Sequence, residues 1–510
     1  MKRLAAVVLV AACCLACRNA SQADRGPAGV REPAVAGRFY PGSAAALRGA
    51  VEGFLRDAVP RKAARPVALV APHAGYVFSG QTAADAWRQA QGEAVDLVVI
   101  LGTNHTAPGF RGVAIDPAGG YRTPIGVAET DRGASDALIA ADPDCVFDAG
   151  VHAREHSVEV QVPFVQVLFP KARILPAVVG SPDPGLCDRL GRALGSVLSG
   201  RRALVVASSD LSHYPSAADA AAADAKVLDA VARLDPKGLR SAIRDEMARG
   251  VPGLSTCACG EAPILAAMSA ARALGATRGT VASYANSGDV AVGDPHRVVG
   301  YGAVVFTDGP PGADTAVLAP RREAVAAGGF DAADRRALLA LARETIRRYL
   351  ESGTIPRPRG LSARARRPSG AFVTLTRDGA LRGCVGRMAA DTPLDRVVGA
   401  MAIQAAVNDR RFSPVTPEEL PRLRVEISVL TPMKPVAGAG DIVVGRDGVL
   451  LAKNGRSAVF LPQVATEQGW GREEMLDHLC LKAGLPAGSW RSGAKFSVFQ
   501  AEVFREGEEM

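Results

Sequence analysis

The chain has 510 residues, more than one ordinary domain holds, so we expect two or three domains. Hydrophobic residues make up 48% of the sequence, which is enough for substantial cores. The formal net charge of +8 is spread along the whole chain, without a dense Lys/Arg stripe that alternates with aromatic residues. We therefore expect no nucleic acid among the partners of this protein.

The first 17 residues have the form of a secretory signal peptide. Lys2 and Arg3 precede an apolar run over residues 4–16, which is too short to span a membrane as a mature helix. A small or apolar tripeptide before a cysteine resembles a bacterial lipoprotein signal. Cys17 gives the more usual signal length, and Cys13 is the alternative. We expect an exported lipoprotein, anchored to a membrane surface and facing the periplasm; if the signal is spurious, the protein is cytoplasmic.

Residues 31–307 alternate buried strands with helices, after a polar tether over residues 18–30. This alternation predicts an α/β domain with a mostly parallel central sheet. The expected strands are 67–71, 96–101, 172–179, 203–207, 281–284 and 298–306. The expected helices begin near residue 44 and cover 80–91, 217–234 and 260–274.

Three of these strands are followed by turns that carry histidine. His73 follows the first strand, His105 follows the second, and the pair Asp210 and His213 follows strand 203–207. Parallel neighbouring strands share one end, where open α/β sheets bind ligands. We therefore expect these side chains to converge on one rim of the sheet.

The set of His73, His105 and Cys259 indicates a transition-metal site. Two imidazoles and a thiolate suit iron, copper or zinc, and three protein ligands leave positions open for water, dioxygen or substrate. Cys259 precedes a predicted helix, whose N-terminus would stabilise the thiolate. Asp210 and His213 would act as acid–base groups at the same rim. Alternatively, the histidines only form hydrogen bonds in loops, and the cysteine is a buried residue at a helix start.

Residues 308–328 are rich in proline and glycine and predict a linker to a second domain, residues 329–510. In this domain we expect Asp331 to cap a helix that continues through Leu350. The further expected elements are a hairpin of 371–375 and 381–386, a helix over 394–407, a strand over 424–430, a hairpin over 442–453 that turns at 446–448, a helix over 462–483 and a strand over 495–504. This mixture predicts an α+β fold.

Arg382 and Cys384 alternate along one expected strand and would therefore share a face. Asp409 follows in a second charged segment. A cationic pocket with a thiol would bind an anion or supply a nucleophile, which makes Cys384 a candidate catalytic residue and Arg382 and Asp409 its neighbours. Because no histidine base is evident nearby, a buried structural cysteine with a paired arginine is the stronger alternative.

Seven motifs between residues 31 and 307 resemble the Memo family, whose bacterial members are called AmmeMemoRadiSam system protein B. The motifs are AVAGRFYP (34–41), APHAGY (71–76), LGTNH (101–105), EHSVE (155–159), SSDLSH (208–213), CGEAPI (259–264) and YANSGD (284–289). The resemblance implies a fold similar to that of class III extradiol dioxygenases. It also implies a pocket at the positions of His73, His105 and Cys259 that is linked to copper or iron binding and to redox activity.

The same motifs supply further residues in or around the expected pocket: Tyr76, Asn104, His156, Glu159 and Glu261. Glu155 forms a polar cluster with two of them. Many Memo relatives have a second histidine where this chain has Thr106, and the dioxygenases supply a carboxylate where it has Cys259. The second departure argues against cleavage of catechol rings.

The C-terminal domain resembles the AMMECR family, system protein A of the same gene neighbourhoods. The motifs that carry this resemblance are LRGCVG (381–386), DRRFSP (409–414), FLPQVA (460–465) and EQGW (467–470). The resemblance implies a fusion of two system proteins and does not imply a reaction.

Two classes of function follow. The first is an enzyme, a non-haem iron- or copper-dependent oxidoreductase that acts on an unidentified small molecule. The second is a non-catalytic metal- or ligand-binding accessory protein of a modification pathway whose partner is a radical-SAM enzyme. Export fits the pathway role poorly, because radical-SAM chemistry is normally cytoplasmic.

Overall fold

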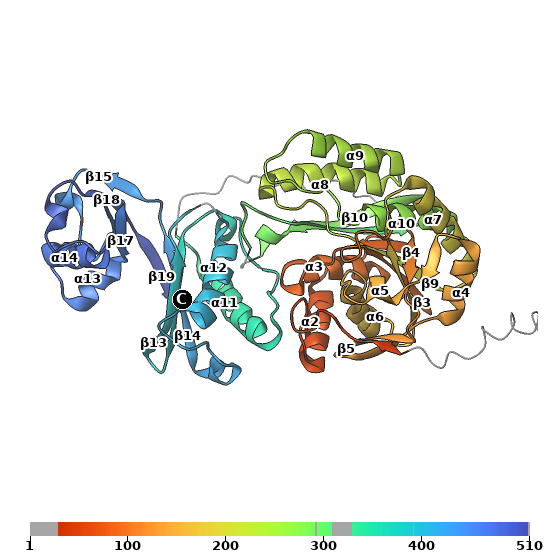
Figure 1. The fold of residues 1–510 in the computed structure, drawn as a ribbon. Coiled ribbons are helices and arrows are strands. Elements are labelled where there is room, and N and C mark those ends of the chain that lie inside the picture. Colours follow the sequence, from red (N-terminus) through yellow and green to blue (C-terminus); the bar gives the residue numbers. More distant parts are fainter. Residues whose placement is uncertain (1–28, 291–292, 309–328, 359, 391, 508–510) are drawn as a thin grey trace, which may run out of the picture. The chain divides into compact units, whose positions relative to one another are not determined.

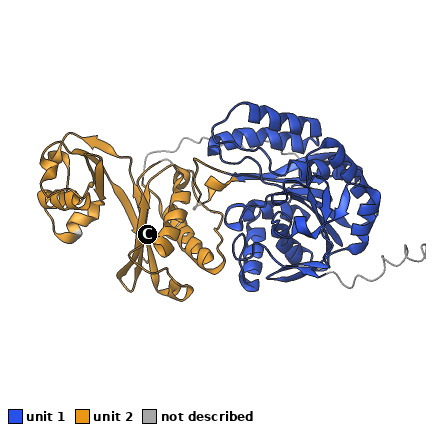
Figure 2. Cartoon of the chain, in the orientation of Figure 1, with its two compact units in different colours: residues 1–285, 299–315 blue, residues 286–298, 316–510 orange. Residues whose placement is uncertain are grey.

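The computed structural model describes residues 29–290, 293–308, 329–358, 360–390 and 392–507. The chain divides into two compact units, residues 1–285 with 299–315 and residues 286–298 with 316–510 (Figure 2). The expected signal peptide and nearly all of the expected tether and linker lie outside the described residues. None of the helices in the described ranges is long and apolar enough to cross a membrane.

The first unit is built on a central sheet with helices around it (Figure 1). The sheet has eight strands in the order β10-β11-β2-β9-β3-β8-β4-β7. Its strands are β2 (Pro66–Ala71), β3 (Leu97–Thr103), β4 (Val113–Ile115), β7 (Cys145–Phe147), β8 (Arg173–Val179), β9 (Ala203–Ser208), β10 (Arg278–Asn286) and β11 (Gly300–Thr307). Strands β2, β9, β3 and β8 are parallel, whereas β11 is antiparallel to β2 and β4 is antiparallel to β8. The mostly parallel α/β sheet predicted from the sequence is confirmed.

Helices cover both faces of this sheet, and for this reason its strands are continuous apolar runs. In β2, Ala68 and Val70 belong to one core, whereas Leu69 and Ala71 belong to the other, because successive side chains of a strand point to opposite faces. The first core includes α4 (Arg132–Ala141), α7 (Pro184–Leu198), α8 (Ala217–Ala232), α9 (Pro236–Ala248) and α10 (Glu261–Ala273). The second includes α2 (Ala44–Asp57), α3 (Tyr76–Trp87) and α6 (Val162–Leu168).

A short helix and a small sheet complete the first unit. The helix is α5 (Ala149–His152), and the sheet has the order β1-β5-β6. Its strands are β1 (Val30–Arg31), β5 (Gly120–Thr123) and β6 (Gly126–Glu129). Val30, which we expected in the tether, is therefore part of a strand that pairs with β5.

The second unit contains two antiparallel sheets, each packed against its own helices. The first sheet has the order β13-β12-β14-β19, with β12 (Ala371–Arg377), β13 (Ala380–Arg387), β14 (Leu423–Leu430) and β19 (Ala501–Arg505), and it packs on α11 (Ala332–Ser352) and α12 (Leu394–Ile403). The second has the order β15-β18-β16-β17, with β15 (Lys434–Val436), β16 (Gly448–Lys453), β17 (Arg456–Phe460) and β18 (Lys495–Phe499), and it packs on α13 (Pro462–Gln468) and α14 (Arg472–Lys482). The predicted α+β fold is confirmed, and Asp331 caps α11 by accepting from Asp334 N at 2.7 Å.

Three expectations for this unit are wrong. The hairpin expected to turn at 446–448 instead joins β16 to β17 at Asn454 and Gly455, which have φ values of 50° and 73° and form the favoured two-residue turn. The helix expected over 462–483 is two helices, because Gly469 ends α13 with a left-handed φ of 71°. The strand expected over 495–504 is β18 and β19, which belong to different sheets.

Candidate metal centre

Three neighbouring strands bring the candidate residues to one rim of the sheet. Strand β9 pairs in parallel with β2 on one side and with β3 on the other. The carboxyl ends of the three strands therefore lie together, as expected for a ligand site in an open α/β sheet. The turns that follow them carry His73, His105 and the pair Asp210 and His213.

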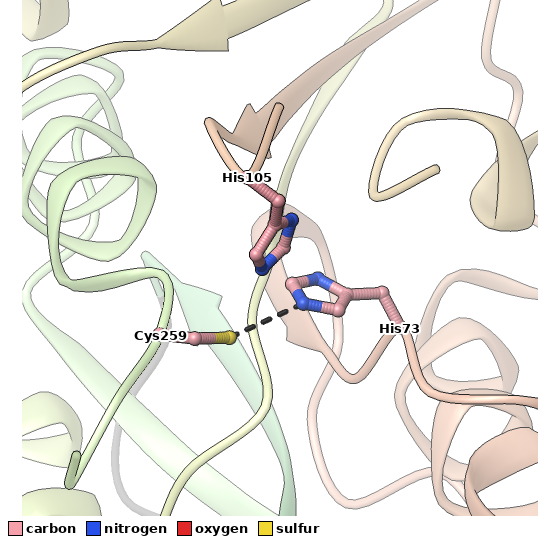
Figure 3. Close-up of side chains that lie close together, drawn as sticks. All are labelled: His73, His105 and Cys259. Carbon is pink, nitrogen blue, oxygen red and sulfur yellow. Dashed lines mark hydrogen bonds between the residues drawn. The ribbon is translucent and has the colours of Figure 1, made fainter. Parts of the chain in front are cut away.

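The ligand atoms of His73, His105 and Cys259 lie within 4.8 Å of one another (Figure 3). His73 Nε2 is 3.2 Å from Cys259 Sγ, and the rings of the two histidines are 5.1 Å apart at an angle of 87°. His73 is buried, but the side chain of His105 is 30% exposed. The cluster is therefore reached from solvent on the side of His105.

A close backbone approach sets the position of Cys259. The residue after it, Gly260, donates its N–H to Ser209 Oγ at 2.9 Å. A Cβ on Gly260 would lie 2.5 Å from Ser209 Cβ and 2.8 Å from Thr103 Oγ1. Glycine is therefore needed for this turn to pack against the ends of β9 and β3, directly before α10 begins.

Burial keeps the Cys259 thiol protonated when no cation is bound. It raises the pKa of the thiol, and the nearby carboxylate of Asp210 raises this pKa further. Burial therefore opposes the stabilisation of the thiolate that we expected from the N-terminus of α10. Burial also lowers the pKa of His73, and repulsion from His105 and His156 adds to this effect. The side chains of His73 and Cys259 are thus both neutral at their 3.2 Å contact.

Asp210 supports the turn that carries His73. Its Oδ1 accepts from His73 N at 2.8 Å and from Ala74 N at 3.3 Å, and its Oδ2 lies 4.0 Å from His73 Nε2. Burial raises the pKa of this carboxyl to about 6. The ligand atoms of Asp210, His213 and Cys259 also lie within 4.8 Å of one another. Asp210 is thus both a support for His73 and a neighbour of the donor cluster.

His213 brings one ring nitrogen to within 4.8 Å of the ligand atoms of Asp210 and Cys259. Its backbone N donates to Thr256 O at 3.0 Å, and within the described part of the chain its buried Nε2 has no hydrogen-bond partner. Burial lowers the pKa of His213 to about 4, so the ring is unprotonated at neutral pH. This nitrogen is available to a bound ion, a water molecule or a substrate.

Glu155 holds the His105 ring, a role that the sequence patterns did not assign to it. Its Oε1 accepts from His105 Nδ1 and from the N–H groups of His156 and Ser157, each at 2.9 Å, and its Oε2 accepts from His105 N at 2.7 Å. Burial alone would raise the pKa of Glu155, but these bonds, led by those with His105, outweigh it and lower the pKa to about 2. Gly102 permits this approach, because a Cβ there would lie 2.6 Å from Val158 Cγ2.

His156 lines the cluster. Its ring stacks on His105, with centroids 4.8 Å apart, and lies 5.4 Å from the ring of His73. On its other side it contacts the ring of Phe39 at 4.7 Å. The AVAGRFYP loop therefore supplies a wall beside the candidate metal ligands.

Tyr76 and Asn104 serve the scaffold around the site. The Tyr76 hydroxyl donates to Val160 O at 2.7 Å, and its buried ring packs in the core between β2 and the helices. Asn104 closes its own loop by donating to Ala107 O at 2.7 Å and accepting from Ala107 N at 3.0 Å.

Glu159 and Glu261 also have partners outside the donor cluster. Glu159 is buried and accepts from Arg31 Nη1 at 2.8 Å and from the Tyr40 hydroxyl at 2.6 Å, so it fixes the N-terminal segment to the domain. Glu261 lies at the start of α10 and pairs with Arg240 at 3.5 Å. Neither residue belongs to the donor groups found among the described residues.

The donor set fits a transition ion. An ion that binds an imidazole nitrogen at about 2.0–2.1 Å and a thiolate at about 2.3 Å in tetrahedral geometry separates these two atoms by about 3.6 Å. The separation of His73 Nε2 and Cys259 Sγ is 3.2 Å, close to this value. His213 adds a further ring nitrogen within 4.8 Å of Cys259 Sγ. Nitrogen and sulfur donors of this kind suit iron, copper or zinc rather than calcium or magnesium.

Comparison with known proteins assigns the family. A family model described as Memo-like protein matches residues 31–305, more than half of the chain. The chain belongs to the Memo family. A second model, described as AMMECR1, matches residues 339–504. The protein is therefore a Memo domain with a class III extradiol dioxygenase-like α/β fold, followed by an α+β AMMECR1 domain.

Relatives of the Memo family extend from archaea to bacteria. A MEMO1 family protein of Methanopyrus kandleri is 37% identical over 291 residues, which cover 55% of this chain and 99% of the relative. A MEMO1 family protein of Aquifex aeolicus is 37% identical over 278 residues, which cover 54% and 99%. Among solved structures, an uncharacterized protein from Pyrococcus horikoshii is 41% identical and covers 33% of this chain and 90% of its own, with a TM-score of 0.32.

In the AMMECR1 domain, the Arg382 guanidinium is occupied by internal partners. It donates to both carboxylate oxygens of Glu419, at 2.9 and 3.0 Å, and to Ser413 O at 2.9 Å. The guanidinium lowers the pKa of Glu419 to about 2. This pairing leaves Arg382 poorly suited to bind an external anion.

Arg382 and Cys384 are also separated by a bulge. Strand β13 pairs regularly with β12 up to Gly383, and the register then shifts before Leu381, which leaves Arg382 as an extra residue. Alternation along a strand does not extend across such a bulge. The alternation that led us to expect one shared face for the two side chains therefore does not apply here.

The contacts of Cys384 favour a structural role. Its N–H donates to Asp409 Oδ2 at 2.9 Å, its carbonyl accepts from Arg411 at 3.1 Å, and its sulfur accepts from the Thr374 hydroxyl at 3.3 Å. Arg411 also binds Asp409 at 2.7 Å and lowers the pKa of its carboxyl. These bonds tie the LRGCVG and DRRFSP motifs to each other.

We predict that Gly260→Ala destabilises the Memo domain. The added Cβ would overlap Ser209 and Thr103, so the turn must move, at a cost of about 1–3 kcal/mol in the free energy of unfolding. Chemical denaturation of both proteins measures this change. Gly49→Ala is the matched control, because no atom lies within 4 Å of its new Cβ in helix α2. A Gly260→Ala protein as stable as the control would contradict the packing described for this turn.

We predict that Glu419→Gln lowers the stability of the AMMECR1 domain by about 1–3 kcal/mol at neutral pH, because Arg382 loses its charged partner. The folded-state pKa of Glu419 is depressed to about 2. Its stabilisation is therefore complete above the unfolded pKa of about 4.3 and is lost as the pH falls through the folded pKa.

Urea denaturation at neutral and acidic pH tests whether the stabilisation by Glu419 decreases as the pH falls. The difference between wild type and Glu419→Gln is expected to shrink as the pH falls. Glu473→Gln is the control, because the side chain of Glu473 is 70% exposed and water screens its pair with Arg491, which therefore contributes little to stability. A loss in Glu419→Gln that is no larger than in the control would show that the pair is unimportant.

Proposed function

We propose that the Memo domain binds a redox-active transition ion, iron or copper, through His73, His105 and Cys259 and uses it to oxidise an unidentified small molecule. One observation carries this proposal: three soft or borderline donors from segments far apart in the sequence lie within 4.8 Å of one another at the ligand-binding rim of the sheet. A structural role alone does not require a buried imidazole, a second imidazole and a thiol to meet at one point.

The surrounding residues support chemistry at this point. A bound iron or copper ion would supply electron transfer and polarise a coordinated oxygen atom. Asp210 and His213 would bind polar groups of the substrate and exchange protons with them, because both lie beside Cys259. The partly exposed side of His105 and the ring of His156 would form the entrance.

We predict that the full-length protein purified without oxygen contains about one iron or copper ion per chain, because the cluster supplies one set of three ligands. His73→Ala and Cys259→Ser are expected to lose the ion. His296→Ala is expected to retain it, because His296 is exposed and outside the cluster. Elemental analysis for iron, copper and zinc measures all four proteins. Equal metal content in wild type and both cluster variants would contradict the proposal.

The same preparations separate an enzyme from a binding protein. If the metal-loaded protein consumes dioxygen with one of a panel of small reductants, and Cys259→Ser does not, the oxidoreductase is supported. If metal is bound but no reductant is turned over, the Memo domain acts as a metal-binding accessory protein instead.

We further propose that the protein is anchored to a membrane surface through lipidated Cys17, in a segment that lies outside the described residues. Radiolabelled palmitate added to growing cells is expected to label wild type and Cys13→Ser but not Cys17→Ser. Globomycin should cause the precursor to accumulate. An unlabelled, full-length cytoplasmic product would contradict the anchor.

A further inference from the structure

The hydrogen bonds around His73 determine which ring nitrogen carries its proton. His73 Nδ1 lies 3.1 Å from Ser208 Oγ at the end of β9. An indole N–H can only donate, so Trp87 Nε1, at 2.9 Å, identifies Gln161 Oε1 as its acceptor. The amide nitrogen of Gln161 therefore faces the other way and donates to Ser208 Oγ and to Pro72 O, both at 2.9 Å.

The single hydroxyl proton of Ser208 is donated to a backbone carbonyl and is not available to His73. Ser208 Oγ lies 2.7 Å from Ser157 O, and a carbonyl can only accept, so the proton lies on this contact. Gln161 occupies one of the two acceptor positions of the hydroxyl oxygen. Only an acceptor position is left for His73, which must therefore donate from Nδ1 and leave its Nε2 unprotonated.

His105 is also protonated on Nδ1, but its hydrogen-bond partner is a carboxylate. Glu155 receives four N–H groups, three from the backbone and one from His105 Nδ1 at 2.9 Å. An ionised carboxylate can only accept, so Nδ1 is the protonated nitrogen of His105. Figure 3 shows the other ring nitrogen turned toward His73 and Cys259. The two rings thus offer unprotonated Nε2 atoms to the same space.

We propose that Ser208 and Glu155 are positioning residues that hold His73 and His105 as Nδ1–H tautomers, so that both imidazoles present a bare Nε2 to one ion. The purpose of this arrangement rests on the proposed metal site, whereas the tautomers are properties of the metal-free chain. The two partners differ in charge. An anionic partner increases the basicity of a histidine ligand, so His105 is the stronger donor of the two.

Glu155 could instead be read as a ligand, because His105, Glu155 and His156 form a second donor group within 4.8 Å. The hydrogen-bond count argues against this reading. Oε1 accepts three N–H groups and Oε2 accepts a fourth, so together they use about as many lone pairs as a carboxylate offers. The structure therefore assigns to Glu155 the role of orienting His105.

Nitrogen-15 NMR of the histidine side chains tests the proposal in the full-length protein stripped of metal by a chelator. At about pH 8 free imidazole is neutral, and protonated and bare ring nitrogens resonate in separate regions. His73→Gln and His105→Gln assign the two signals. His152 is an internal reference of the opposite tautomer, because its Nε2 donates to Ala114 O at 2.9 Å and its Nδ1 accepts from the Tyr121 hydroxyl at 2.6 Å.

Two variants are expected to act on one ring each. Ser208→Ala should release the tautomer of His73 and leave His105 unchanged, whereas Glu155→Gln should do the reverse. Ser208→Thr keeps the hydroxyl and should restore the wild-type signal. Glu159→Gln removes a neighbouring buried carboxylate that has other partners, so it controls for lost stability. Ser208→Ala and Glu155→Gln should also weaken Zn²⁺ binding by about 10–100-fold.

The outcomes separate this proposal from the metal site itself. A protonated Nε2 on either histidine of the wild type overturns it, as do unchanged signals in both Ser208→Ala and Glu155→Gln. If Ser208→Ala does not fold, the spectra of the wild type and of Ser208→Thr still show which ring nitrogen of His73 is protonated. If both tautomers are as stated but iron, copper and zinc all fail to bind, the positioning stands and the proposed function falls.

Discussion

The parallel pairing of β9 with β2 on one side and β3 on the other is the constraint on which the candidate site depends. It places three strand ends side by side, so that the turns that carry His73, His105 and Asp210 share one rim. The apolar runs that form these strands are buried on both faces, which fixes their register through packing in two separate cores. The stability of the Memo fold and the position of its donor atoms therefore have the same origin.

Close backbone contacts and hydrogen-bonded buried polar groups hold the loops at this rim in place. Gly102 and Gly260 stand where any side chain would overlap a neighbour, which lets the loops of Glu155 and Cys259 reach the strand ends. Among the described residues, the buried Nε2 of His213 has no hydrogen-bond partner. Unsatisfied buried polar groups are costly, so this nitrogen, on a residue next to Cys259, is suited to receive a ligand.

Much of this architecture could be predicted from the sequence, because buried parallel strands are clear apolar runs and three of them are followed by turns that carry histidine. The role of Glu155 could not, since adjacency to His156 in the EHSVE motif does not reveal four convergent N–H donors. The bulge between Arg382 and Cys384 could not be predicted either, because regular alternation was assumed along the whole strand. The misplaced hairpin had an available signal, the Asn454–Gly455 pair, which is a stronger turn sequence than Arg446–Asp447–Gly448.

The most direct test of the metal site is the X-ray absorption fine structure of the iron- or copper-loaded protein at the metal edge. We expect one sulfur neighbour at about 2.3 Å together with imidazole nitrogens at about 2.0–2.1 Å, and loss of the sulfur shell in Cys259→Ser. A shell of oxygen and nitrogen without sulfur, unchanged in that variant, would contradict it.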